Sequence, residues 1–212
     1  IGSQILTHYP EDIETARRIT EQESKLDKRQ TEAIYVPDLA KDLLEQISRE
    51  ARESEYVDAK SGISARMSIT SFENLMSTAE RRLLKNGQQT TMIRLSDFMG
   101  VIPSIIGKIE LVYEGEQEGS GSVAEILIED AVKSLFLNYF PKIDKLERKD
   151  AVGPYDELVS WFFDGEGFDL LDDATDKEYK EKLDSIIPLQ QLVTKYQPDI
   201  EKEDTYFLKE LL

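Results

Sequence analysis

Apolar residues recur at the spacing of a helix over most of the chain. The clearest stretch follows Pro37, and proline is favoured in the first turn of a helix. Its apolar residues stand at i, i+4, i+7 and i+8, and they are Leu39, Ala40, Leu43, Leu44, Ile47 and Ala51. Because this spacing places apolar side chains on one face, the sequence predicts an amphipathic helix here.

A longer helix is predicted to begin near Ser68 or Thr70, since Thr70 and Glu73 have the spacing of a capping box. Asn86-Gly87 is predicted to end it, because glycine readily takes the left-handed conformation that closes a helix. The side chains predicted for its buried face are Phe72, Leu75, Met76, Ala79, Leu83 and Leu84.

The remaining sequence predicts several more helices. They cover 11–30, 96–102, 123–139, 176–187, 188–196 and 203–212, and residues 155–163 form a short aromatic stretch. Pro103 is expected to interrupt the second of these. Residues 90–94 favour an extended connection, and the polar, glycine-rich residues 114–122 favour a loop. The predicted fold class is therefore all-α, with a boundary near 141–154 that divides residues 1–141 from an acidic, mainly helical segment, 142–212.

The composition excludes several kinds of partner and chemistry. The chain has 43 Asp and Glu against 26 Lys and Arg, a net charge of −17, and a negative field repels nucleic acid and anionic lipid. No apolar run approaches the roughly 20 residues that span a bilayer. We therefore expect no nucleic-acid partner and no membrane association. The absence of Cys and the single His8 exclude thiolate chemistry, His-based zinc sites and a Ser-His-Asp triad.

The acidic clusters do not indicate a metal site. Glu114, Glu116 and Glu118 lie in a glycine-rich stretch, where carboxylates are usually solvated. Asp172 and Asp173 lack the spacing of a calcium loop and have no base or nucleophile beside them in the sequence. We therefore expect no metal ligand and no catalytic residue in this chain.

The residues from Ser61 to Thr70 carry the strongest candidate for a binding role. Arg66 follows a turn built from Ser and Gly and stands just before the longer predicted helix. Arginine offers several donors on an always-charged planar fork. A helix N-terminus adds unpaired N–H groups and a positive dipole end. Arg66 is therefore the candidate for touching a nucleotide phosphate, and the alternative is a surface arginine that pairs with a nearby carboxylate.

Several separated strings, taken together, resemble one family. They are Thr7–Pro10, Glu21–Glu23, Val36–Pro37, Ala51–Arg52, Val57–Asp58, Ser61–Arg66, Arg81–Arg82 and Gly107–Glu116. The set resembles the region after the ATPase core in magnesium-chelatase-I-like, MoxR-related AAA+ proteins. The likeness covers roughly residues 5–140, and residues 141–212 match only loosely.

This resemblance implies an AAA+ lid, a helical bundle that follows the nucleotide-binding core. The string Ser61–Arg66 looks like the family's sensor 2 motif, which makes Arg66 the arginine that reaches the γ-phosphate of ATP. The partners implied are the chain's own AAA+ core domain, neighbouring subunits of a ring and an unknown client protein, and the implied location is cytoplasmic. Arg81 and Arg82 are expected on a solvated helix face, the alternative being that they face a neighbouring subunit.

The core motifs of that family are missing from these 212 residues. They are the phosphate-binding loop, the acidic Mg²⁺ motif, sensor 1 and the arginine finger. We therefore expect the chain to be a piece of a longer ATPase whose core binds ATP and Mg²⁺, with no cofactor and no activity in the chain alone. The alternative is an acidic helical protein-interaction module with no nucleotide role. Trp161–Phe163 is expected to be a core anchor or a docking face rather than a platform for base stacking, because its surroundings are acidic.

Overall fold

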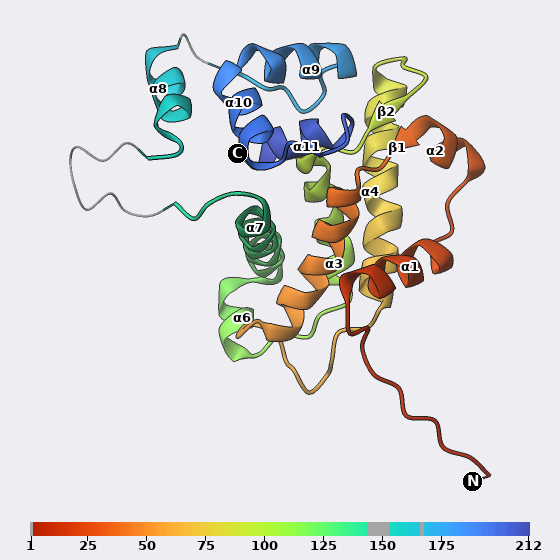
Figure 1. The fold of residues 1–212 in the computed structure, drawn as a ribbon. Helices are drawn as coiled ribbons and strands as arrows, with labels where there is room; N and C mark the ends of the chain where they lie inside the picture. Colours follow the sequence, from red (N-terminus) through yellow and green to blue (C-terminus); the bar gives the residue numbers. More distant parts are fainter. Residues whose placement is uncertain (1, 144–152, 166–167) are drawn as a thin grey trace.

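The computed structural model describes residues 2–143, 153–165 and 168–212, and helices dominate these ranges (Figure 1). The elements are α1 (Ile13–Glu23), α2 (Lys28–Ala33), β1 (Ile34–Tyr35), α3 (Asp38–Glu53), α4 (Arg66–Lys85), β2 (Thr91–Met92), the 3-10 helix η1 (Leu95–Val101), α5 (Ile102–Ile106), α6 (Tyr113–Glu118), α7 (Ser120–Tyr139), α8 (Asp156–Asp164), α9 (Asp176–Ser185), α10 (Ile187–Tyr196) and α11 (Asp204–Leu211). The prediction of a mainly helical fold is confirmed. None of the helices in the described ranges is both long and apolar enough to cross a bilayer.

Helix α3 lies at the centre of the fold, packed against α1, α4, α7 and α11. It begins directly after Pro37, as predicted, and all six apolar residues of its predicted face are buried. Helix α7 includes the helix predicted over 123–139, and it buries its own apolar face against α3. Since each large apolar side chain contributes about 1.5–3 kcal/mol when fully buried, these faces supply much of the stability of the fold.

Helix α4 begins at Arg66, earlier than the predicted start at Ser68 or Thr70. Met67 and Ser68 are buried against the core, so tertiary contacts extend the helix toward its N-terminus. The predicted capping box is wrong, because Thr70 lies inside the helix. The Glu73 carboxylate instead accepts the backbone N–H of Lys25, 2.8 Å away.

The end of α4 agrees with the prediction, but one predicted core residue does not. Asn86 caps the helix, and Gly87 follows with a φ of 62°, a conformation that glycine takes without a Cβ penalty. Leu84 was predicted to be buried, but it is exposed. It is adjacent to the buried Leu83, and neighbouring residues of a helix point about 100° apart, so Leu84 lies off the buried face.

The single helix predicted over 11–30 is two helices. α1 ends at Glu23, and the Asp27 side chain begins α2 by accepting the backbone N–H of Arg29, with Gln30 completing a capping box. The Ser24 hydroxyl donates to a carbonyl in the last turn of α1, which supports the break. Short polar side chains compete with helix hydrogen bonds in this way, so the continuous pattern was misleading.

Two predictions between residues 96 and 122 are also wrong. Pro103 does not interrupt a helix but lies in the first turn of α5, where its missing N–H costs nothing. Residues 114–122, predicted as a loop, form most of α6 and the first turn of α7. Gly119 joins these two helices with a φ of 95°, so glycine is what allows such a close junction.

The strands form a two-stranded parallel pair in which Ile34 faces Thr91 and Tyr35 faces Met92. The extended connection predicted over 90–94 contains β2, but nothing predicted β1. A strand of two residues is too short to show an alternation of apolar and polar residues in the sequence. The pair ties the end of α2 to the segment that follows α4.

The C-terminal helices pack on the same body as α3 and α4. The side chains that join the main core from this segment include Val193, Phe207, Leu208 and Leu211. A smaller apolar cluster unites α8, α9 and α10 around Tyr179 and reaches Met92 of β2. Helices α9 to α11 match the predicted positions, whereas α8 forms from the short aromatic stretch over 155–163, for which no helix was predicted. The proposed boundary between 1–141 and 142–212 stays a prediction, and residues 144–152 lie outside the described ranges.

Candidate phosphate-contact site

Arg66, the sequence-predicted site residue, is the first residue of the 20-residue helix α4. Its side chain is exposed, and within the described ranges its guanidinium has no carboxylate within ion-pair distance. The Arg66 backbone N–H donates to the Ser64 hydroxyl oxygen, 3.2 Å away. The alternative of a surface arginine paired with a neighbouring carboxylate is therefore not what the described residues show. A free cation at a helix N-terminus is suited to an external anion.

The turn before Arg66 is held by hydrogen bonds to the segment near Leu111. Val57 forms an antiparallel bridge with Leu111, and the Asp58 backbone N–H donates to the Glu110 carbonyl oxygen at 2.8 Å. The Ser61 hydroxyl lies 2.5 Å from a Glu110 carboxylate oxygen and 3.1 Å from one of Asp58. Ser61 thus fixes the shape of the turn.

The same turn is also bound by the segment before α1. The Ile63 backbone N–H donates to the Tyr9 hydroxyl oxygen, 2.9 Å away. The Arg52 guanidinium lies 4.2 Å from the centre of the Tyr9 ring. The structure therefore brings together strings that are 54 residues apart, Thr7–Pro10 and Ser61–Arg66. Tyr9 was not predicted as a site residue, and the only sequence signal for it was its place in one of these strings.

A buried polar cluster fixes the first turn of α4 to α1 and α3. The Glu45 carboxylate accepts hydrogen bonds from the Thr20 hydroxyl at 2.6 Å and the Ser68 hydroxyl at 2.9 Å. Ser48 lies 2.6 Å from Ser68. Burial raises the pKa of Glu45, although the two hydroxyl donors oppose that effect. Since Ser68 is two residues from Arg66, this cluster fixes where the helix begins.

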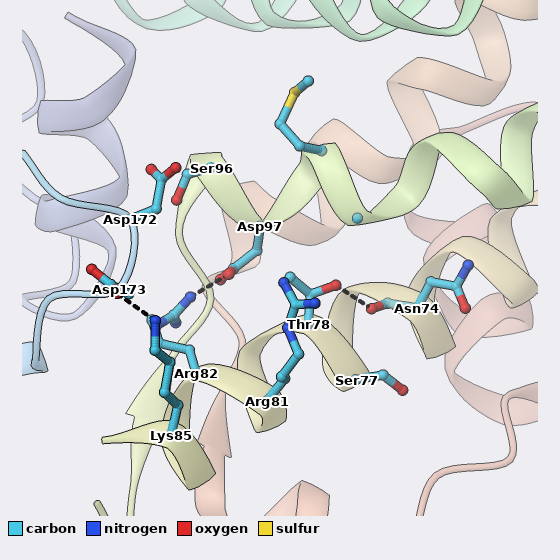
Figure 2. A pocket seen from close by; sticks show the side chains of 12 residues that line it. Asn74, Ser77, Thr78, Arg81, Arg82, Lys85, Ser96, Asp97, Asp172 and Asp173 are labelled. Carbon is cyan, nitrogen blue, oxygen red and sulfur yellow. Dashed lines mark hydrogen bonds and ion pairs between the residues drawn. The ribbon is translucent and has the colours of Figure 1, made fainter. Parts of the chain in front are cut away.

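A second polar feature lies near the other end of α4, where a hollow of about 960 Å³ opens between α4, η1 and residues 172–173 (Figure 2). Arg81 is exposed beside it, as predicted, and Lys85 reaches across to the Asp173 carboxylate at 2.5 Å. At 1.5 Å per residue, the 15 residues between Arg66 and Arg81 correspond to about 22 Å along the helix. The hollow is therefore separate from the Arg66 turn.

Arg82 corrects the prediction of a solvated helix face. Its side chain is buried, it pairs with the Asp97 carboxylate, and it donates to the Met92 carbonyl oxygen at 2.6 Å. Figure 2 shows it directed toward Asp97. The Asp97 carboxylate also accepts the Arg94 backbone N–H at 2.8 Å. Arg82 is consequently a structural residue that holds η1 on α4, and it is unavailable to a neighbouring subunit.

The acidic clusters do not assemble into a metal centre. Among the residues that the structure describes, no group of three or more His, Asp or Glu side chains is arranged to hold a metal ion. Asp173 is bound to Lys85, and the Asp172 carbonyl oxygen accepts from Arg94. These contacts give the two aspartates a structural use.

Glu210 provides a pH-dependent stability that can be measured. Its carboxylate accepts the Leu95 backbone N–H at 2.8 Å, and burial raises its pKa to about 7, with Asp97 adding to the rise and Arg94 opposing it. A folded-state pKa above the ordinary value gives a stability that is complete below about pH 4.5 and is lost as the pH rises through 7.

We expect Glu210→Gln, which keeps an oxygen to accept the Leu95 N–H, to remove this loss. Relative to the variant, the free energy of unfolding of the wild type should fall by about 3 kcal/mol between pH 4.5 and 8, because each pKa unit corresponds to about 1.4 kcal/mol. Urea unfolding at four pH values across that range measures the difference. All other titrating groups are common to both proteins, so parallel profiles would contradict the assignment to Glu210.

Comparison of the chain with known protein families, curated proteins and solved structures found no match. The structure itself defines a mainly α-helical protein with an exposed arginine at the first residue of α4. The resemblance to AAA+ lids stays a prediction.

Proposed function

We propose that the chain is the lid and C-terminal region of a cytoplasmic, MoxR-related AAA+ ATPase, and that Arg66 senses the γ-phosphate of ATP. The observation that carries the proposal is the position of Arg66. Its exposed guanidinium stands at the first residue of α4 and pairs with no carboxylate in the described ranges. The turn before it and the polar cluster behind it keep this position fixed.

ATP with Mg²⁺ would bind to the core domain and supply the phosphoryl group that is transferred to water. Arg66 would place its positive charge against the terminal phosphate and stabilise the charge that develops there during hydrolysis. Once that phosphate leaves, Arg66 loses its partner, and the lid becomes free to rotate as a rigid body. The rotation would pass to the neighbouring subunit of a ring and then to a client protein.

The chain alone is expected to be inactive and to bind ATP weakly. One arginine–phosphate contact contributes about 1.5–3 kcal/mol. Micromolar affinity requires about 8 kcal/mol, so the remaining contacts must come from a core domain. Micromolar binding of ATP to these 212 residues in a calorimeter would contradict the proposal.

The direct test is Arg66→Ala in the full-length ATPase. We expect ATP turnover to fall by about 100-fold or more, because a preorganised donor for transition-state charge is lost. The fold should be unchanged, since the side chain is exposed. The matched control is Arg18→Ala, which removes an exposed arginine of α1 and should leave turnover at the wild-type level. Wild-type turnover in Arg66→Ala would remove the sensor role.

The second candidate function is an acidic helical protein-interaction module with no nucleotide role. The observation that favours it is the exposure of aromatic side chains on the acidic helix α8, where Phe162 and Phe163 face solvent. Trp161 packs edge-on against Phe162 and Phe168, so this helix combines an aromatic cluster with an exposed face. Unchanged turnover in Arg66→Ala, or the absence of any ATPase core beside the chain, would favour this candidate.

A further inference from the structure

The turn before Arg66 is bound by two different parts of the chain, through two sets of contacts that we call ties. The first set joins Val57, Asp58 and Ser61 to the segment around Glu110 and Leu111. The second is a single tie from the segment before α1. Figure 1 shows this N-terminal segment running away from the helical body. Because the N-terminal segment lies outside the helical body, this second contact can be released while the contacts of the first set stay in place.

Tyr9 makes this tie with its hydroxyl group, which accepts the Ile63 backbone N–H at 2.9 Å. The contact depends on Gly62, which has a φ of 68° and no side chain. A Cβ at Gly62 would lie 2.8 Å from the Tyr9 hydroxyl oxygen. The side chain of Ile63 is buried in the core, and this burial restrains the backbone N–H group that the Tyr9 hydroxyl binds.

Arg52 holds the Tyr9 ring from the other side. Its guanidinium lies 4.2 Å from the ring centre, the geometry of a cation–π contact. Its Nε is buried and has no hydrogen-bond partner among the described residues, and it forms no ion pair there. The aromatic ring is thus the main partner of this arginine, which belongs to α3.

We propose that Tyr9 is a positioning residue that regulates the Arg66 site, an inference that rests on the proposed function. When the segment before α1 is bound to the turn, the Tyr9 hydroxyl accepts the hydrogen bond from Ile63. The turn then has one conformation, and Arg66, three residues later, has one position. When the segment is released, the turn samples other positions, and only a fraction of molecules present Arg66 correctly. Apparent affinity for ATP then falls by that fraction.

The test uses Tyr9→Phe, which keeps the ring for Arg52 and removes only the acceptor oxygen. In the 212-residue chain, the amide hydrogen of Ile63, followed by NMR, should exchange about 3- to 10-fold faster, the factor expected for one neutral hydrogen bond. The thermal unfolding midpoint should hardly move. The control is Tyr113→Phe, an exposed tyrosine whose hydroxyl makes no hydrogen bond in the described ranges.

In the full-length ATPase, Tyr9→Phe should raise KM for ATP by about 3- to 10-fold and change kcat by less than about 2-fold, because bound ATP selects the correct turn. In an Arg66→Ala background, the same substitution should have no further effect on KM, since the two residues act through one contact. A merely structural role would give additive effects.

The outcomes separate the two proposals. Unchanged exchange of Ile63 in Tyr9→Phe overturns the tie itself, whatever the enzyme does. Faster exchange with an unchanged KM, while Arg66→Ala is impaired, overturns the regulatory role but leaves the sensor role of Arg66. Wild-type turnover in Arg66→Ala overturns the proposed function and, with it, the regulation by Tyr9.

Discussion

Replacing Arg94 with Met should lower the free energy of unfolding by about 3–5 kcal/mol, the range found when one partner of a buried ion pair is removed. The Arg94 side chain is 1% exposed. One of its terminal nitrogens, Nη2, lies 2.8 Å from an Asp176 carboxylate oxygen and 2.9 Å from the Ala174 carbonyl oxygen. The guanidinium also lies 4.2 Å from the centre of the Tyr179 ring.

Methionine replaces the aliphatic part of the arginine side chain but has no charge and no donor. The Arg94→Met variant therefore removes the charged partner of the Asp176 carboxylate, which keeps the Thr91 hydroxyl at 2.8 Å. It also removes the donor to the Ala174 carbonyl in a poorly hydrated place. Urea unfolding followed by circular dichroism measures the loss. The residues that Arg94 binds connect the C-terminal helices to the segment after α4. The substitution should therefore lower the unfolding midpoint of the whole chain rather than of one segment.

Lys85→Met is the matched control, because Lys85 pairs with Asp173 of the same connecting segment, 2.5 Å away. The Lys85 side chain is 63% exposed, and exposed ion pairs contribute about 0–1 kcal/mol. A clear difference between the two variants is expected. Equal effects would mean that the burial of Arg94 does not govern the strength of its contacts.

Arg94 and Arg82 also show where prediction from the sequence stops. Helices α3, α7 and α9 to α11 were predictable because their signals, apolar spacing and flanking proline or glycine, lie within each helix. The burial of Arg82 depends on Asp97 and Met92, and that of Arg94 depends on residues about 80 positions later. No local pattern distinguishes such an arginine from one on a solvated face.

The candidate site divides in the same way. Arg66 could be predicted because a turn, an arginine and a helix start are neighbours in the sequence. The start of α4 was predicted two to four residues too late, because the burial of Met67 and Ser68 depends on tertiary contacts. The Tyr9 contact spans 54 residues and depends on the conformation of Gly62. A sequence pattern contains neither the distance nor the φ angle.

The second large effect is expected for Phe207→Ala, which should lower the free energy of unfolding by about 3–5 kcal/mol, as for other aromatic-to-alanine changes in a core. Phe207 is 0% exposed and belongs to the main core. Its ring centre lies 6.2 Å from that of Phe98 in η1. Helix α11, which carries it, also packs against α3. Phe163→Ala, at a side chain that is 84% exposed, is the control and should change the stability by less than about 0.5 kcal/mol.

The same experiment tests the boundary between residues 1–141 and 142–212. The chain has one tryptophan, Trp161, and it lies in α8, so its fluorescence reports the C-terminal segment while circular dichroism reports all helices. Because Phe207 and Leu208 complete the core formed by α3 and α4, both signals should move together in urea, and Phe207→Ala should shift both midpoints equally. A fluorescence transition that separates from the dichroism transition would mean that residues 142–212 unfold as an independent unit, in spite of the apolar core that they share with α3.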